Sequence, residues 1–211
     1  MYWAIGDVHG AIFSLEKLVK KLPKDAKLVF VGDLIDRGRY SKEVVEFVRQ
    51  SQSLCVMGNH ESFMIKFGKQ SLDKPTIWTQ EPIYGGEATV ASYKGDEKLF
   101  LEHIDFFRGL PYYLEIEGRY ITHGFGLPYY RRRKSHGVFL LENSLEDISF
   151  DWEEWWKYEV FNIFGHTPYE EVLFGPNYAG IDTGCIFGGK LSALSLDSLE
   201  VISVELDSRD I

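Results

Sequence analysis

The feature that most constrains the fold of this chain is a set of short apolar runs that each stop at a glycine. The first three runs are Tyr2–Ile5 before Gly6, Leu28–Val31 before Gly32 and Leu54–Met57 before Gly58. They are separated by Ile12–Leu22, which has apolar residues at helical spacing, and by a helix expected after Ser41 as its N-cap. This alternation of strand and helix predicts parallel strands joined by right-handed crossovers.

The remainder of the chain predicts a helical segment followed by further strands. Helices are expected over Ser62–Lys69, Gly86–Tyr93 and Asp96–Phe107, and we expect the segment around 62–110 to form a helical cap. The later strands are expected at Tyr112–Ile116, Tyr120–Thr122, Val160–Phe164, Leu191–Leu196 and Val201–Leu206. Two packed sheets with helices outside fit this inventory, and a single domain over residues 1–211 is the simplest organisation.

Residues of the types that bind metal ions follow five of these strands. The set is Asp7 and His9 after the first strand, Asp33 after the second, Asn59 after the third, and His123 and His166 after two later strands. Because sites in open α/β sheets lie at the carboxyl ends of strands, we expect these side chains to meet. Mixed imidazole and oxygen donors favour manganese, with iron or zinc as alternatives. Two divalent ions can share the set if Asp33 bridges them.

The residues beside these ligands predict phosphoryl chemistry. Two metal ions about 3.5–4 Å apart can clamp a phosphoryl group and acidify a water between them. His60 is the candidate general acid for the leaving group, and Asp36 is the candidate carboxylate that holds the His60 imidazole protonated. Arg37 carries a planar fork of donors that suits the non-bridging oxygens of a phosphate. We therefore predict that a hydroxide bound to a metal pair hydrolyses a phosphate ester.

Three sequence blocks resemble the signature of a known enzyme family. They are Gly6-Asp7-Val8-His9-Gly10, Gly32-Asp33-Leu34-Ile35-Asp36-Arg37-Gly38 and Gly58-Asn59-His60-Glu61. In this order they are similar to the calcineurin-like metallophosphoesterases, above all to the phosphoprotein phosphatase branch, and the likeness extends over residues 6–196. The resemblance implies an α/β fold, a four-layer αββα sandwich of two mixed sheets flanked by helices, with a dinuclear site at the strand ends.

The same resemblance implies a role for each residue of the set. Asp7 and His9 would bind the first metal, Asn59, His123 and His166 would bind the second, and Asp33 would bridge the two. The chain departs from the family at Met57, where many members carry arginine, and no arginine clearly matches the second one that binds phosphate. The run Arg131–Lys134 supplies the only arginines between the two later histidines, and it either holds a phosphate or forms a solvated loop.

Three functions remain open. The leading hypothesis is a phosphomonoesterase like the bacterial serine/threonine protein phosphatases, which the tripeptide Asp36-Arg37-Gly38 favours. The alternative is a symmetrical bis(5'-nucleosyl)-tetraphosphatase that hydrolyses diadenosine tetraphosphate, with which Ile181–Leu196 is compatible. The third is a catalytically silent metal-binding interaction module, against which the His60–Asp36 pair argues. The partner is accordingly a phosphorylated protein or a nucleotide.

Charge and hydropathy exclude other classes. A net charge of −9 argues against a nucleic-acid partner, because proteins that grip nucleic-acid backbones present a basic footprint. Neither a cationic leader nor an apolar run long enough to span a bilayer is evident, so we expect a soluble cytoplasmic protein without a membrane partner. The two cysteines, Cys55 and Cys185, are expected to be reduced and buried. The sequence leaves the oligomeric state undetermined.

Several aromatic and histidine residues have an ordinary structural interpretation. Trp152, Trp155 and Trp156 are expected to pack a helix rather than to stack on a nucleobase. His103 lies within a helical pattern and is expected to be exposed or half-buried, and His136 is expected to be a loop residue without a role in the site.

Overall fold

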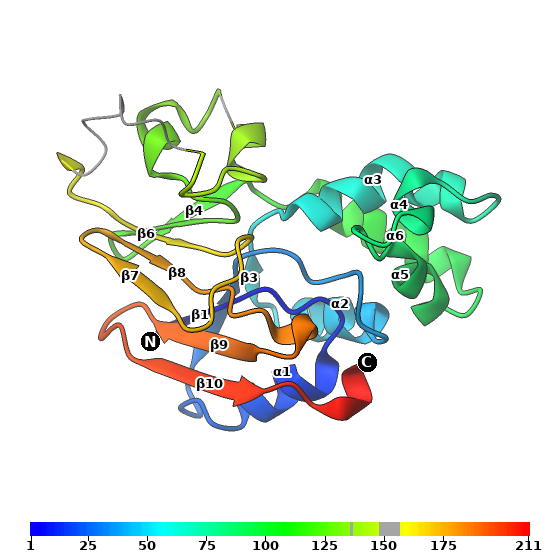
Figure 1. Cartoon of the computed structure of the whole chain (residues 1–211), viewed down its shortest axis with the longest axis horizontal. Coiled ribbons are helices and arrows are strands. Elements are labelled where there is room, and N and C mark those ends of the chain that lie inside the picture. Colours follow the sequence, from blue (N-terminus) through cyan, green and yellow to red (C-terminus); the bar gives the residue numbers. More distant parts are fainter. Residues whose placement is uncertain (136, 148–156) are drawn as a thin grey trace.

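The computed structural model describes residues 1–135, 137–147 and 157–211, and Figure 1 shows them arranged around two β-sheets. The first sheet contains β1 (Tyr2–Ile5), β2 (Lys27–Phe30), β3 (Leu54–Cys55), β9 (Lys190–Ser195) and β10 (Val201–Glu205). Its order is β10-β9-β1-β2-β3. Strands β1, β2 and β3 are parallel, as the strand–helix alternation predicted, whereas β9 runs antiparallel to both β1 and β10.

The second sheet is built from the later part of the chain. It contains β4 (Tyr113–Ile116), β5 (Arg119–Thr122), β6 (Phe161–Phe164), β7 (Leu173–Gly175) and β8 (Tyr178–Gly180), in the order β4-β5-β6-β8-β7. Strands β5, β6 and β8 are parallel, and the outer strands β4 and β7 are antiparallel to their neighbours. Two mixed sheets are therefore confirmed. The hairpin of β7 and β8 was missed because three residues are too few to show a periodicity.

Alternation along the strands explains how the first sheet is buried on both faces. In β2, Val29 faces the second sheet, whereas Leu28 and Phe30 face the helices, because successive side chains of a strand point to opposite faces. The core between the sheets joins aliphatic residues of both. The first sheet and its turns contribute Ala4, Val29, Val31, Val56 and Leu194, and the second contributes Ile121, Ile163, Ala179 and Ile181.

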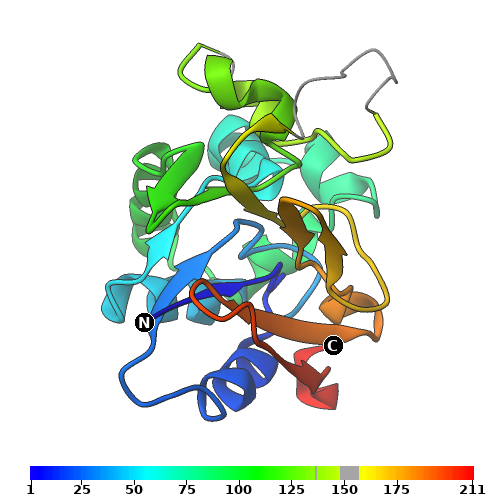
Figure 2. The same cartoon turned by 90° about the vertical axis from the view of Figure 1, so that its left-hand side faces the viewer.

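Six α-helices accompany the first half of the chain. They are α1 (Ile12–Val19), α2 (Ser41–Gln50), α3 (Asn59–Ser71), α4 (Ile77–Gln80), α5 (Gly86–Ser92) and α6 (Glu97–Arg108). Figure 2 shows α1 on the side of the first sheet that faces away from the second. Figure 1 shows α3–α6 gathered together at one side, in the segment expected to be a cap. Buried side chains from α3, α4 and α6 nevertheless belong to the same apolar cluster as those of α1 and α2.

The capping prediction at Ser41 was wrong by one residue. Tyr40 occupies the N-cap position and its side chain makes no capping hydrogen bond. Ser41 is instead the first helical residue, fully buried, and its hydroxyl accepts a hydrogen bond from the backbone N–H of Asp36 at 3.1 Å. Its polar side chain therefore serves the turn that follows β2 rather than the helix.

The outer face of the second sheet is covered by 3₁₀ turns in the described part of the chain. Tyr120, Phe125 and Phe164 pack with residues of η1 (Leu127–Arg132) and η2 (Gly137–Leu140). The basic run lies at the end of η1. There Arg133 Nε donates to Glu115 of β4 at 2.7 Å, and its guanidinium lies 4.3 Å from the centroid of the Tyr130 ring. These contacts give Arg133 a structural role.

Other expectations have mixed outcomes. Cys55 and Cys185 are buried free thiols, as expected. Within the described ranges, no helix combines the length and apolar character that a bilayer crossing requires. His136, Trp152, Trp155 and Trp156 lie outside the described residues.

His103 differs from its expected exposure because it connects three helices. Its side chain is fully buried in α6. Nδ1 lies 2.6 Å from the hydroxyl of Tyr93, just after α5, and Nε2 lies 2.8 Å from Glu46 Oε1 of α2. Because its two partners lie outside α6, the helical spacing alone could not reveal this burial.

We predict that His103→Ala lowers the free energy of unfolding by about 1–3 kcal/mol, because it leaves two polar partners without their hydrogen bonds. Urea denaturation measures the change. Lys98→Ala on the same helix is the control, since the Lys98 side chain is 89% exposed. Equal stability of the two variants would mean that His103 does not hold the helices together.

Candidate metal centre

The parallel strands of both sheets deliver their following turns to one place. Asp7 and His9 follow β1, Asp33 follows β2, and Asn59 begins α3 beyond β3. His123 follows β5 and His166 follows β6. All six are buried or half-buried, although five carry an imidazole or a carboxylate. Charged and titratable groups of this kind are rarely buried without partners, so their gathering needs a chemical explanation.

Two groups of side chains offer ligand atoms within 4.8 Å of one another, and Asp33 belongs to both. The first group is His9, Asp33 and His60, and the second is Asp33, His123 and His166. One oxygen of Asp33, Oδ2, lies 3.6 Å from His9 Nε2, while the other, Oδ1, lies 3.3 Å from His123 Nε2. A carboxylate that turns one oxygen to each group is suited to bridging two cations.

Hydrogen bonds to backbone carbonyls fix the tautomers of two histidines. Nδ1 of His9 lies 2.7 Å from the carbonyl oxygen of Ile35, and Nδ1 of His123 lies 2.8 Å from that of Val31. Because a carbonyl can only accept, each Nδ1 carries a proton, and Nε2 is the ring nitrogen that faces Asp33 and is available to a cation. Metal-ligating histidines are oriented in this way by their second ring nitrogen.

The carboxylate of Asp7 indicates that the site fits a cation. Its Oδ2 accepts a hydrogen bond from the backbone N–H of His166 at 3.0 Å. Its Oδ1 is buried and has no hydrogen-bond partner among the residues the structure describes. A buried oxygen without a donor is costly, and a bound metal ion would satisfy it. Asp7 lies outside the two groups of Asp33, but its contact with His166 places it at the same site.

Asn59 and His166 complete the gathering. The side-chain amide of Asn59 contacts Nε2 of His123 at 2.8 Å. The rings of His123 and His166 meet edge to face, with centroids 5.1 Å apart. The structure thus brings together every residue that the sequence proposed as a metal ligand.

Glu61 is a site residue whose part the sequence did not reveal. Its side chain is fully buried. Oε2 accepts from the backbone N–H groups of Asp33 and Gly58, both at 2.9 Å, and Oε1 accepts from that of Leu34 at 2.8 Å. Glu61 therefore ties the turn after β2 to the start of α3. Its place three residues after the helix N-cap was the available signal, because capping boxes put a glutamate there.

His60 and Asp36 form a buried pair at the edge of the first group. His60 Nδ1 lies 2.6 Å from Asp36 Oδ2, and His60 Nε2 points toward Asp33 at 3.8 Å. Two residues of the helical segment hold Asp36 in turn. Trp78 Nε1 donates to Asp36 Oδ2 at 2.7 Å, and Thr89 Oγ1 donates to Asp36 Oδ1 at 2.6 Å.

The sequence did not predict the contacts of Trp78 and Thr89 with Asp36, because these residues lie 42 and 53 positions from it. The local signal was the pair of glycines at the start of α5. A Cβ on Gly86 would stand 2.3 Å from the Trp78 ring, so the indole can reach Asp36 only past a residue without a side chain.

Arg37 lies beside the metal centre. Its Nη1 contacts Nε2 of His9, its Nη2 donates to the carbonyl of Ile83 at 3.2 Å, and its guanidinium lies 5.1 Å from the centroid of the Phe187 ring. The guanidinium is thus close enough to the ligands to reach a phosphate bound there.

Backbone strain is concentrated at these residues. Nine non-glycine residues of the described chain have positive φ, and five of them are predicted site residues: His9 (46°), Asp33 (50°), Asp36 (74°), Arg37 (70°) and His166 (69°). Such conformations cost free energy and persist where the surrounding structure imposes them, commonly at functional sites.

The shifts in pKa follow from burial and from the crowding of charges. Burial and the charge of His60 lower the pKa of His9 well below its usual range. Burial opposes the charged form of His60 too, but the carboxylates of Asp33 and Asp36 raise its pKa. Burial and the charge of Asp182 raise the pKa of Asp7 well above its ordinary value. Neighbouring groups whose pKa values are shifted in opposite directions are characteristic of functional sites.

Comparison with known proteins agrees with this geometry. Residues 2–202 match the family described as Calcineurin-like phosphoesterase, which confirms the resemblance predicted from the three sequence blocks. The asymmetrical bis(5'-nucleosyl)-tetraphosphatase PrpE of Anoxybacillus flavithermus is 30% identical over 236 residues, covering 97% of this chain and 94% of that protein. The enzyme of the same name from Geobacillus sp. is 31% identical and covers 95% and 92% of the two chains.

Solved structures share the fold. A candidate diadenosine tetraphosphatase superposes with a TM-score of 0.72 at 21% identity, covering 98% of this chain and 94% of that one. A protein serine/threonine phosphatase from Saccharomyces cerevisiae has a TM-score of 0.66 at 15% identity, covering 98% and 79%. At these identities the likeness supports the architecture alone.

The shared position of Asp33 yields a prediction about metal binding. We expect the wild-type chain to bind about two Mn²⁺ ions, and Asp33→Asn to weaken the binding of both, because both groups of ligand atoms include its carboxylate. Equilibrium dialysis against manganese measures the stoichiometry and the affinities. Asp105→Asn, an exposed change on α6, should leave them unaltered. Unchanged binding by Asp33→Asn would contradict the shared site.

Proposed function

The chain belongs to the calcineurin-like phosphoesterase family, and from this premise we propose that it hydrolyses bis(5'-nucleosyl) tetraphosphates asymmetrically, to a nucleoside monophosphate and a nucleoside triphosphate. As a member of this family it is a hydrolase of phosphate esters. The observation that carries the finer proposal is the match to relatives named as asymmetrical tetraphosphatases, which covers nearly the whole of both chains. Because these relatives are named for the asymmetrical reaction, we propose it ahead of the protein phosphatase and the symmetrical tetraphosphatase that the sequence analysis considered.

We assign Asp7 and His9 to one divalent ion, Asn59, His123 and His166 to the other, and Asp33 to both. Two such ions, when bound, supply an activated water and neutralise the charge of the phosphoryl group. The backbone carbonyls behind His9 and His123 keep each Nε2 available as a ligand atom. Manganese fits this donor set best, with iron and zinc as alternatives.

Arg37 is assigned to the phosphate chain. Its guanidinium lies against the ring of His9, so a phosphate held at the centre comes within its reach. A planar fork of N–H donors can bind two non-bridging oxygens at once and thereby orient the phosphorus.

His60 is assigned as the general acid. Its Nδ1 is held by the buried carboxylate of Asp36, which leaves Nε2 directed at the centre. A proton on Nε2 can pass to the leaving oxygen as the bond to phosphorus breaks. Trp78 and Thr89 are positioning residues, because they hold the Asp36 carboxylate that orients the imidazole.

The same pair favours one second candidate, hydrolysis of phosphoserine or phosphothreonine in proteins. A serine oxygen leaves as a much stronger base than a phosphate oxygen does, so it gains more from a positioned acid. A network of three buried side chains, Asp36, Trp78 and Thr89, that orients one imidazole suits such a leaving group.

Product analysis distinguishes the two candidates. Manganese-loaded protein is incubated with diadenosine tetraphosphate and, separately, with phosphoserine and phosphothreonine peptides. We expect AMP and ATP from the dinucleotide, at a kcat/KM well above that for the peptides. ADP as the only product would indicate symmetrical cleavage, and phosphate release from peptides alone would establish the second candidate.

The assignment of His60 predicts a dependence on the leaving group. His60→Asn should lower kcat by about 10²–10⁴-fold on an alkyl phosphate and much less on p-nitrophenyl phosphate, whose leaving group needs no proton, while the metal content stays that of the wild type. Trp78→Phe should show the same pattern with a smaller loss, and no further loss in the His60→Asn background.

Trp3→Phe is the matched control for Trp78→Phe. Trp3 is also buried, but its Nε1 has no hydrogen-bond partner within the described part of the chain, so the change tests packing alone. If Trp78→Phe and Trp3→Phe behave alike on both substrates, the indole does not act through Asp36.

A further inference from the structure

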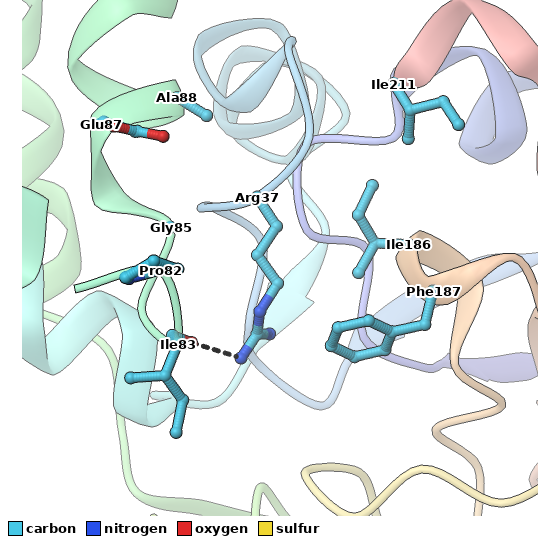
Figure 3. Close-up of a pocket in the computed structure, with 9 residues that line it drawn as sticks. All are labelled: Arg37, Pro82, Ile83, Gly85, Glu87, Ala88, Ile186, Phe187 and Ile211. Atoms are coloured by element: carbon cyan, nitrogen blue, oxygen red, sulfur yellow. Dashed lines mark hydrogen bonds between the residues drawn. The ribbon is translucent and has the colours of Figure 1, made fainter. Parts of the chain in front are cut away.

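A pocket of 390 Å³ opens next to Arg37, outside the set of metal ligands. Figure 3 shows Arg37 between two walls. One wall is formed by the segment before and at the start of α5, from Pro82 to Ala88, and the other by Ile186 and Phe187 of η4 (Cys185–Phe187). Ile211 completes the lining.

Arg37 joins this pocket to the metal centre. Its backbone N–H donates to the carbonyl of Gly85 at 3.1 Å, and its Nη2 donates to that of Ile83, so the first wall is fixed to the arginine. The Nη1 atom of the same guanidinium contacts the ring of His9. A molecule whose phosphate lies at the centre therefore has the pocket beside it, one arginine side chain away.

The walls expose apolar side chains to an unusual degree. Phe187 is 66% exposed and Ile83 is 73% exposed. Single exposed apolar residues are ordinary, but several around one pocket beside a catalytic site indicate a place where a ligand with an apolar face binds.

Phe187 lies in a short 3₁₀ turn that is flanked by two glycines. Gly184 and Gly188, on either side of η4, both adopt left-handed conformations, with φ of 65° and 90°. The Phe187 ring lies 5.1 Å from the Arg37 guanidinium, and its exposure leaves ring surface available for a second planar group.

The pocket lining includes charged side chains of both signs. Among the residues described around the pocket, Arg37 provides the cation and Glu87 the carboxylate. Glu87 is exposed in the first turn of α5, on the wall across Arg37 from Phe187 (Figure 3). The pocket thus combines an aromatic face, an acceptor of hydrogen bonds and a phosphate-binding cation.

We propose that this pocket binds the purine nucleoside next to the phosphate being attacked, with its base against Phe187 and its amino edge toward Glu87. The proposal rests on the proposed function and specifies which part of the substrate the protein recognises. A purine has a planar π-face for the ring and N–H donors for the carboxylate, while its 5'-phosphate lies toward Arg37. An aliphatic peptide side chain would use the apolar walls but would leave Glu87 without a partner.

The test compares two ligands that differ only in the base. AMP and ribose 5-phosphate are used as competitive inhibitors of the manganese-loaded protein, with p-nitrophenyl phosphate as the reporter substrate. We expect AMP to bind more tightly than ribose 5-phosphate. Phe187→Ala should weaken the binding of AMP by about 5- to 100-fold, the range that base–aromatic stacking supplies. It should weaken the binding of ribose 5-phosphate much less. Glu87→Gln should weaken AMP by a smaller factor.

Phe174→Ala is the control variant. Phe174 is also an exposed phenylalanine, at 47%, but it lies on β7 of the second sheet. Its removal should leave the affinity for both ligands unchanged. Equal affinities of AMP and ribose 5-phosphate for the wild type, or an equal loss of both in Phe187→Ala, would overturn the proposal.

Failure of the pocket and failure of the proposed function are distinguishable. If the protein prefers AMP through Phe187 but does not cleave diadenosine tetraphosphate, the proposed nucleoside pocket stands and the proposed reaction is wrong. If the protein cleaves diadenosine tetraphosphate asymmetrically and Phe187→Ala does not change this activity, the proposed reaction stands and the proposed nucleoside pocket is wrong.

Discussion

The buried carboxylate of Asp33 is the constraint on which the rest of this structure depends. It is 2% exposed, and each of its oxygens faces a different group of imidazoles. A carboxylate in such surroundings is stable only when opposite charge compensates for its lost hydration. Here burial would raise the pKa of Asp33, but the neighbouring His123 and His60 hold it well below its ordinary value. The same surroundings suit a pair of divalent ions, which is why the turns of both sheets converge at this point.

This convergence imposes a cost on the backbone that other residues offset. Asp33 and His9 adopt left-handed conformations, and these persist because hydrogen bonds from several parts of the chain fix the turns. Glu61 holds the turn after β2 from the start of α3, and the carbonyl of Val31 holds His123 across the two sheets. The helical segment takes part as well, since Trp78 and Thr89 reach Asp36 behind His60. What the sequence presented as a cap is therefore part of the support of the site.

The sequence predicted the parts of the site that local pattern encodes. Each apolar run that ended in a glycine became a strand with a site residue behind it, and the ligand types at those ends pointed to metal and phosphate chemistry. Residues that act across long stretches of chain left no such trace. Trp78 belongs to a helix of four residues and meets Asp36 only in the folded chain. The sequence pattern of His103 was that of an ordinary helical histidine, because its partners, Tyr93 and Glu46, lie outside α6. The strands β7 and β8 have three residues each, which is too short to show a periodicity in the sequence.

The most direct test of this account is anomalous diffraction at the manganese edge from crystals grown with Mn²⁺. We expect two peaks about 3.5–4 Å apart, one on either side of the Asp33 carboxylate, with His9 beside one peak and His123 beside the other. A single peak, or two peaks that do not share Asp33, would contradict the claim that this carboxylate organises a dinuclear centre.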